Sequence, residues 1–279
     1  MMNYNEFKIA AVEEMKKAGD DVQVVKAAKV NGSKEGIAFR QGGDVAKTIY
    51  IDDMYDKFNE LGNFEETISY FMELLDGSEL GDEVKDEIMS NIKAKKFFPC
   101  LVNATRSKEL LETALSRPLA GDVSVIYRVS AETGSEEAST VITKGLAEAY
   151  GLTEEEVYDS AILNEGHQIM SFGEFFAKMG MPPLPADHPQ MYIVTRKSSI
   201  NGSGMVLCEK VLAELEEKLG ESFYILPSSV HEVICLAPGC ADSLELAKIV
   251  VDVNRTVLAE NDFLSDGVFL YEDGKIKAA

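Results

Sequence analysis

Residues that build disulfide frameworks and metal centres are scarce in this sequence. Its 279 residues include only four cysteines and three histidines. A chain of this length can bury a sizeable apolar core without covalent cross-links, and scattered cysteines favour free thiols in a reducing compartment. Metal centres need several His or Cys ligands at short spacing, and these few residues do not provide such a set. We therefore predict a cytoplasmic protein with no metal and no cofactor.

The sequence also has few basic residues relative to acidic ones, and it has no long apolar run. The 27 Lys and Arg residues stand against 48 Asp and Glu residues, so the formal net charge is −21. Such a surface repels nucleic-acid backbones and anionic lipid head groups. No segment approaches the ~18 apolar residues of a membrane span, and residues 1–17 lack the pattern of a secretory signal. We predict no nucleic acid and no membrane as partners, which leaves an unknown protein or small molecule.

What the sequence does contain is the composition of an ordinary globular protein, with 46% hydrophobic residues. Apolar residues at helical spacing predict a helix over residues 5–18. Asn31-Gly32 lies between two strand-like runs and predicts a β-hairpin over residues 22–39. Helices should follow, the first of them capped by an aspartate after residue 51. The chain therefore opens with a helix, a hairpin and a helical lobe.

Strands and helices alternate in the remainder. Apolar, β-branched runs predict buried strands at residues 97–102 and 123–129, and Thr153 facing Glu156 is a capping box that opens a helix. Four prolines within residues 182–189 disfavour both helix and central strand. Beyond them, periodicity predicts helices at residues 209–219 and 242–258, and strands at residues 191–195, 204–208, 222–227, 232–236 and 268–271. This order allows a βαβ unit but leaves the strand orientations open.

These elements predict a mixed fold of the α+β or α/β class. The N-terminal helix, hairpin and helical lobe would form an α+β lobe over residues 1–181. A C-terminal mixed sheet with packed helices would form an α/β lobe over residues 190–279. The Pro-rich connection, residues 182–189, would join the two lobes into one integrated unit.

The densest group of polar side chains lies between two of these apolar runs. It comprises Ser228, Ser229, His231 and Glu232, and Cys235 follows within the second run. His231 and Cys235 have the i, i+4 spacing of zinc ligands on a helix. The run after Glu232 is apolar and β-branched, however, and residues four apart on a strand are about 13 Å apart. A zinc site is therefore disfavoured.

Two interpretations of this group remain. Ser228 or Ser229 could act as a nucleophile with His231 as its base, which would make the protein a serine-dependent hydrolase. No Gly-x-Ser-x-Gly motif supports that chemistry. Alternatively, the side chains satisfy the backbone of a tight turn and hold two strands in register. We favour the turn and keep the four polar residues as candidate catalytic residues.

Three other features have a structural interpretation beside a functional one. Asn201-Gly202-Ser203-Gly204 could hold a phosphate, but it precedes a predicted strand, which favours an ordinary turn. His167 is interpreted as the C-terminal cap of a helix. Asp52 and its acidic neighbours could bind a cation, yet acidic residues in a first helical turn usually complement the helix dipole.

Five segments, taken in order, resemble a domain-of-unknown-function family from anaerobic gut bacteria. They are Lys29-Val30-Asn31-Gly32, Thr48-Ile49-Tyr50-Ile51, Leu101-Val102-Asn103, Met191-Tyr192-Ile193-Val194-Thr195 and Leu226-Pro227-Ser228-Ser229-Val230-His231-Glu232-Val233-Ile234. The resemblance extends from Tyr4 to Tyr271, and Leu-Pro-Ser-Ser-x-His-Glu is its most specific part. It implies a bacterial, cytoplasmic protein and one fold across both lobes, with no known activity. The glycine-rich loop at residues 201–204 departs from the family pattern.

No complete catalytic constellation is visible in the sequence. We therefore predict a binding or regulatory protein rather than an enzyme, in which the turn at residues 228–232 is structural or contacts a partner. The serine-dependent hydrolase is the alternative. The two differ in geometry, because a hydrolase needs a serine-to-histidine contact near 3 Å and free donors for an oxyanion.

Overall fold

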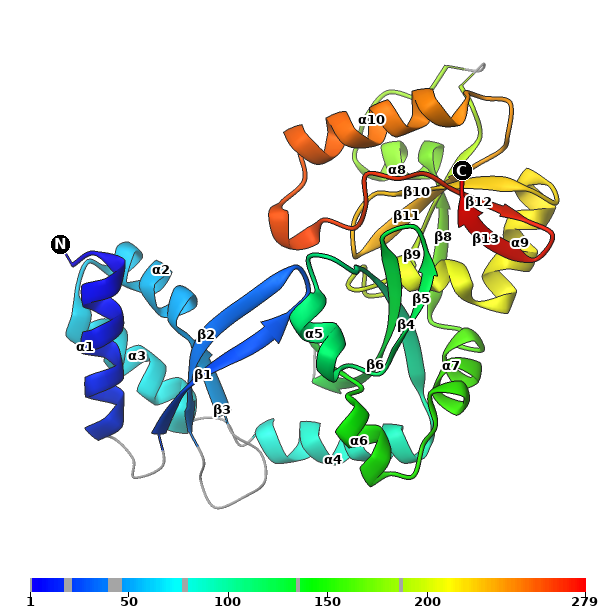
Figure 1. Ribbon diagram of the computed structural model, residues 1–279. Helices are drawn as coiled ribbons and strands as arrows, with labels where there is room; N and C mark the ends of the chain where they lie inside the picture. The colour runs from blue at the N-terminus through cyan, green and yellow to red at the C-terminus, as the bar shows by residue number, and fades with distance from the viewer. Residues whose placement is uncertain (1, 18–21, 40–46, 77–79, 134–135, 186–187) are drawn as a thin grey trace. The chain divides into compact units, whose positions relative to one another are not determined.

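The computed structural model describes residues 2–17, 22–39, 47–76, 80–133, 136–185 and 188–279 (Figure 1). Contacts within the chain separate two compact units, Met1–Glu83 and Val84–Ala279. Each unit has a buried apolar cluster of its own. The mixed α+β class is confirmed, because both units combine helices with antiparallel sheets.

The first unit packs helices against a three-stranded antiparallel sheet in the order β1-β2-β3. Its elements are α1 (Tyr4–Lys17), β1 (Val22–Lys29), β2 (Gly32–Phe39), β3 (Lys47–Tyr50), α2 (Ile51–Leu61) and α3 (Phe64–Asp76). The first helix and the hairpin are confirmed, and Asn31 has the positive φ, 60°, that such a turn requires. Phe7 of α1 stacks on Phe58 of α2 in the buried cluster.

The predicted aspartate cap of α2 is wrong. The helix begins at Ile51 with Tyr50 as its N-cap, and no side chain caps it. Ile51 is fully buried, so core packing starts the helix ahead of the acidic residues. Asp52 and Asp53 lie in the first turn, where they complement the helix dipole, and Asp52 also accepts a 2.5 Å hydrogen bond from the Tyr4 hydroxyl.

Helix α4 (Leu80–Lys93) leads into the first sheet of the second unit. The strands of this sheet are β4 (Phe97–Asn103), β5 (Ser116–Ala120), β6 (Val123–Thr133) and β7 (Glu136–Val141). β6 pairs with β4 along one edge and with β5 and then β7 along the other. The helices that follow these strands are α5 (Lys108–Thr113), α6 (Lys144–Ala149) and α7 (Glu154–Ile162). The capping box predicted at Thr153 is confirmed.

The second sheet has six strands in the order β13-β12-β10-β11-β9-β8, and every neighbouring pair is antiparallel. The strands are β8 (His167–Ser171), β9 (Met191–Arg196), β10 (Phe223–Pro227), β11 (Glu232–Leu236), β12 (Phe269–Glu272) and β13 (Lys275–Ala278). β9 and β10 run in the same direction with β11 between them. The predicted βαβ unit is therefore present in split form.

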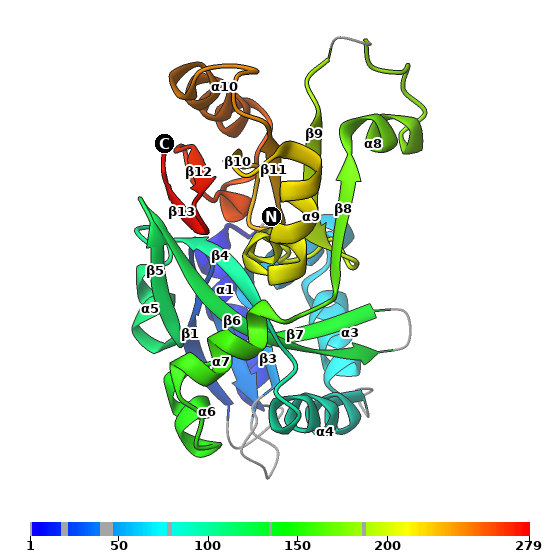
Figure 2. The ribbon, with the colours of Figure 1, turned by 90° about the vertical axis from the view of Figure 1, so that its right-hand side faces the viewer.

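Helices α9 (Glu209–Leu219) and α10 (Ser243–Thr256) lie on opposite sides of this sheet (Figure 2). Leu246 and Val250 of α10 form a buried cluster with Leu226 and Leu236 of the sheet. Successive residues of a strand point to opposite faces of the sheet, so Val233 and Cys235 of β11 lie on the face away from α10. Both are fully buried. Both sides of the central strands are thus covered, which explains their nearly continuous apolar sequence.

The strand predicted at residues 204–208 is wrong, because residues 204–207 belong to the 3₁₀ helix η1 (Ser203–Leu207) and Cys208 is its C-cap. All five residues of η1 are buried. An apolar run of this length signals burial, but its period does not separate a strand from a short buried helix.

The Pro-rich connection lies within the second unit and joins β8, through helix α8 (Phe172–Lys178), to β9. These two strands pair from His167 with Arg196 to Ser171 with Tyr192. The connection therefore links neighbouring strands of one sheet. Residues 186–187 lie outside the described residues.

Candidate functional site

The polar group singled out in the sequence forms the turn of a β-hairpin. β10 ends at Pro227, β11 begins at Glu232, and Pro227 is opposite Val233 in the register. The predicted tight turn between two separate strands is confirmed. Because β11 is extended, Cys235 is carried into the core, where burial raises the pKa of its thiol. No group of three or more His, Cys, Asp or Glu residues within the described ranges is arranged to hold a metal ion.

Both serines of the turn are hydrogen-bonded within the turn itself. The Ser228 hydroxyl donates to the Glu232 carboxylate at 3.3 Å. The Ser229 hydroxyl accepts from the backbone N–H of His231 at 3.0 Å, and the Ser229 N–H donates to the Glu232 carbonyl at 3.1 Å. These are the short-range bonds with which Ser stabilises turns.

The His231 ring is engaged at both nitrogens. Its Nδ1 accepts from the backbone N–H of Asn201 at 3.0 Å, which leaves the proton on Nε2. Nε2 then donates to the Asp262 carboxylate at 3.1 Å. Neither serine hydroxyl is hydrogen-bonded to the ring among the described residues. Neither partner was predicted, because each lies about thirty positions away along the chain.

The glycine-rich segment at residues 201–204 is hydrogen-bonded both to this turn and to β4 of the first sheet. The Gly202 N–H donates to the His231 carbonyl at 3.0 Å. Ser203 accepts at its hydroxyl a 3.1 Å hydrogen bond from the Leu101 N–H of β4. A Cβ on Gly204 would lie 2.3 Å from the Pro99 backbone, so only glycine fits there. The segment is a close-packed connection, and the glycines serve that packing.

The two other histidines lie in simpler surroundings. His167 opens β8 and contacts Glu214 through Nε2 at 3.2 Å. Its prediction as a helix C-cap is wrong, because α7 ends at Ile162 and Leu163 is the cap residue. His188 lies over the Phe172 ring with 6.5 Å between the ring centroids.

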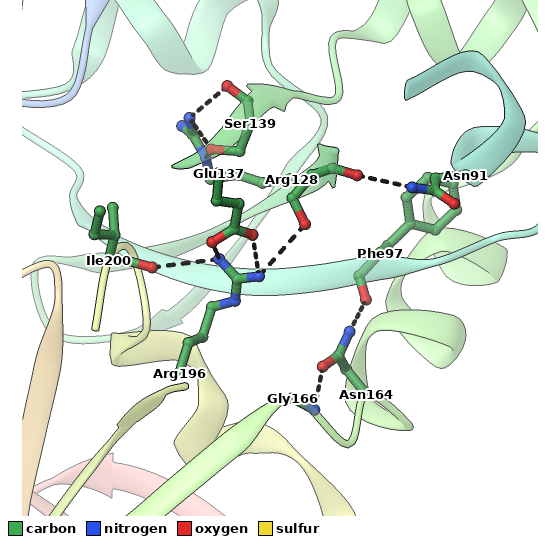
Figure 3. A network of polar contacts seen from close by, with 10 residues as sticks. Asn91, Phe97, Arg128, Glu137, Ser139, Asn164, Gly166, Arg196 and Ile200 are labelled. Atoms are coloured by element: carbon green, nitrogen blue, oxygen red, sulfur yellow. Dashed lines mark hydrogen bonds and ion pairs between the residues drawn. The ribbon is translucent and has the colours of Figure 1, made fainter. Parts of the chain in front are cut away.

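A cavity of about 630 Å³ lies elsewhere in the second unit, and we call it the Arg196 pocket. Its walls come from the C-terminal part of α4, the start of β4, the end of β6, the end of α7 and the end of β9 (Figure 3). The lining residues are Glu87, Asn91, Lys95, Lys96, Phe97, Phe98, Ser130, Glu132, Ser160, Leu163, Asn164, Glu165, Gly166 and Arg196. Sequence analysis did not identify this pocket.

Arg196 is held rigidly at the pocket wall. Its Nη2 donates to the Glu137 carboxylate at 2.5 Å and its Nη1 donates to the same carboxylate at 3.2 Å (Figure 3). The guanidinium also lies 3.6 Å from the centre of the Phe98 ring. The two side chains are only 12% and 18% exposed. Burial alone would raise the pKa of the Glu137 carboxyl, but the hydrogen bonds from Arg196, Ser130 and Ser198, together with the Arg196 charge, outweigh it and lower that pKa.

Two asparagines fix the neighbouring backbone. Asn91 of α4 donates from its side chain to the Ser130 carbonyl at 2.9 Å. Asn164 donates to the Phe97 carbonyl at 2.9 Å and accepts from the Gly166 N–H at 2.8 Å (Figure 3). The pocket is therefore formed in advance by bonds between its own walls, which lowers the ordering cost of binding a ligand.

A second cation, Arg128, lies beside this network on β6. It donates from Nη2 to the hydroxyl and the carbonyl of Ser139, at 3.0 and 3.2 Å (Figure 3). Burial lowers the pKa of its guanidinium. The face of β6 and β7 toward Arg196 is thus polar, although the sheet is otherwise part of an apolar core.

Comparison with known proteins gives a family and no activity. A family model described as a family of unknown function (DUF5688) matches residues 4–273. Neither the curated proteins nor the solved structures contain a significant match. Within the described residues, no helix combines the length and apolar character that crossing a membrane requires.

Proposed function

The chain belongs to the DUF5688 family of unknown function, and we propose that it is a non-catalytic binding protein that takes a small polar ligand in the Arg196 pocket. The volume of about 630 Å³ falls in the range of about 300–1,000 Å³ typical of small-molecule sites. The lining is mostly polar and charged, with large apolar side chains only from Phe97, Phe98 and Leu163, so it suits a polar ligand.

The observation that carries this proposal is a difference between the turn at residues 228–232 and the pocket: the pocket has charged side chains without a partner among the described residues. In the turn at residues 228–232, the hydroxyls and the imidazole are bonded to nearby groups. In the pocket, the side chains of Glu87, Lys96 and Glu132 have no hydrogen-bond or ion-pair partner among the described residues. Unused charges that converge on a preformed cavity favour recognition of a ligand over a purely structural role.

The compartment and origin are further parts of the proposal. The four cysteines are free thiols, which supports a reducing compartment such as the bacterial cytoplasm. The net charge of −21 disfavours nucleic acid and anionic membranes as partners. A protein partner that acts through ligand binding would make the role regulatory.

A fragment screen read by ligand-observed NMR tests the pocket. Leu163 lines it and is 62% exposed, so Leu163→Trp should obstruct the entrance without disturbing the core. The matched control is Leu244→Trp, at a 73% exposed leucine of α10. We expect fragments that bind the parent chain and Leu244→Trp equally and Leu163→Trp at least about tenfold more weakly. An absence of hits, or equal binding to all three proteins, would overturn the proposal.

A serine-reactive covalent probe tests the alternative hydrolase. A serine nucleophile needs its hydroxyl hydrogen-bonded to a base, and the described contacts of His231 lead to Asn201 and Asp262 instead. We expect the probe to label neither Ser228 nor Ser229. Stoichiometric labelling of either serine, mapped by mass spectrometry, would replace the binding proposal with an enzymatic one.

A further inference from the structure

The charges that line the Arg196 pocket fall into two sets. Arg196 is paired with Glu137, Lys95 with Glu156, and Glu165 with Lys210. In each of these pairs the partner lies outside the lining. These three charges are already paired within the protein, although the buried Arg196 Nε has no hydrogen-bond partner among the described residues.

The second set is Glu87, Glu132 and Lys96, for which no partner is found in the described part of the chain. Glu87 lies one turn before Asn91 on α4, Glu132 lies two residues beyond Ser130 on β6, and Asn91 is bonded to Ser130. Lys96 lies in the connection between α4 and β4, just after α4 ends. The free set therefore carries two negative charges and one positive charge.

From this set we infer that the pocket takes a free basic amino acid. Such a molecule has one carboxylate for Lys96 and two cationic groups for Glu87 and Glu132, so the bound charges cancel. The inference rests on the proposed function, since it names the ligand of the same pocket. A cationic ligand is also drawn toward a chain of net charge −21.

Other ligand classes leave a charge unmatched. A dicarboxylate or a phosphate ester would bring negative charge to Glu87 and Glu132, and like charges repel. A diamine would satisfy the two glutamates but would leave Lys96 without an anion. Only a ligand with both kinds of group matches the whole set.

Isothermal titration calorimetry of the full chain with four probes tests the inference. The probes are L-lysine, L-arginine, L-glutamate and cadaverine, which is lysine without its carboxylate. We expect L-lysine or L-arginine to bind at least about tenfold more tightly than L-glutamate and cadaverine. Tighter binding of L-glutamate, or equal binding of lysine and cadaverine, would overturn the inference.

Three variants separate the roles of the charges. Lys96→Met should weaken L-lysine about tenfold and should not weaken cadaverine, because only L-lysine has a carboxylate. Glu87→Gln and Glu132→Gln should weaken both probes. The matched controls are Lys93→Met and Asp86→Asn, at exposed positions of α4 outside the lining, and these should bind like the parent. Equal losses of both probes in Lys96→Met would contradict the assignment of the carboxylate.

Failure of this inference differs from failure of the proposed function. If fragments bind in a manner sensitive to Leu163→Trp but no basic amino acid binds, the pocket is a binding site for another class of ligand and the inference is wrong. If neither fragments nor amino acids bind, both are wrong.

Discussion

Two polar regions of the second unit differ in how their side chains are used. The turn at residues 228–232 has the densest cluster of reactive residue types in the sequence, and its hydroxyls and imidazole are bonded to neighbouring groups. The Arg196 pocket takes its residues from four separate stretches of the sequence, and three charged side chains in its lining have no partner among the described residues. The dense cluster of reactive residue types in the sequence therefore marks a turn whose side chains are hydrogen-bonded. Charged side chains without a partner around a cavity indicate a binding site instead.

Gly202 connects the two regions, and its substitution should have the largest effect. A Cβ at this position would lie 2.3 Å from the backbone nitrogen of Arg196, 2.5 Å from the Thr195 hydroxyl oxygen and 2.8 Å from the His231 carbonyl oxygen. We expect Gly202→Ala to lower the free energy of unfolding by about 3 kcal/mol, because backbone must move to admit the methyl group. Urea denaturation measures the change.

A matched glycine gives the control for this prediction. Gly145 lies in helix α6, and no atom lies within 4 Å of the Cβ it would acquire. Gly145→Ala should therefore be neutral or stabilise the protein by about 0.5 kcal/mol through helix propensity. If the two alanine variants unfold alike, the close packing at Gly202 does not constrain the fold.

The salt bridge behind the pocket should come second. Glu137→Ala leaves the largely buried Arg196 guanidinium without its anion, so we expect a loss of about 2 kcal/mol, tempered by residual solvent access. Glu132→Ala is the control, because Glu132 is exposed and has no partner among the described residues. Equal stability of the two variants in urea at pH 7 would show that the bridge contributes nothing.

The same bridge predicts a pH dependence. The pKa of Glu137 is lowered from its ordinary value of 4.5 in the folded protein, so the unfolded chain binds the proton more tightly. Its contribution to stability is complete above the ordinary value and is lost as the pH falls through the lowered folded pKa. The gap in stability between the parent chain and Glu137→Ala should therefore narrow below about pH 4.5. A gap that is constant down to pH 3 would contradict this.

Local signals predicted much of the fold correctly. The hairpin at Asn31-Gly32, the capping box at Thr153 and the strands on either side of residues 228–231 depend on neighbouring residues, and all three are confirmed. The errors arose where contacts between residues far apart in the sequence determine the secondary structure. Residues 204–207 are helical in a buried segment whose Gly204 packs against the β4 backbone, and α2 starts early because Ile51 is buried.

The candidate site was less predictable for the same reason. Asp262 and Asn201 complete the surroundings of His231 from about thirty residues away. Arg196 follows an apolar strand and meets Glu137 across 59 positions. A charge at the end of an apolar strand is a weak signal by itself, because most such charges are solvated. Only the tertiary structure shows which of them line a cavity.

Substitutions in the turn should have moderate effects. His231→Ala removes bonds to Asn201 and Asp262, and because the side chain is 34% exposed we expect a loss of about 1–2 kcal/mol. Ser228→Ala and Ser229→Ala should each cost less than about 1 kcal/mol, because one local hydroxyl bond can be replaced by water. Denaturant melts of the three variants give the ranking. A His231→Ala protein as stable as its parent would remove the structural role assigned to the ring.

The smallest effect on stability belongs to the pocket. Lys96 is exposed and has no partner among the described residues, so Lys96→Met breaks no bond on which the fold depends. We expect the unligated variant to unfold within about 0.5 kcal/mol of the parent. The expected losses of stability in Lys96→Met and His231→Ala then differ. Removing a side chain that supports the fold lowers the free energy of unfolding, whereas removing one that only contacts a ligand does not. If Lys96→Met costs as much as His231→Ala in the absence of ligand, Lys96 supports the fold and the contrast between the two regions does not hold.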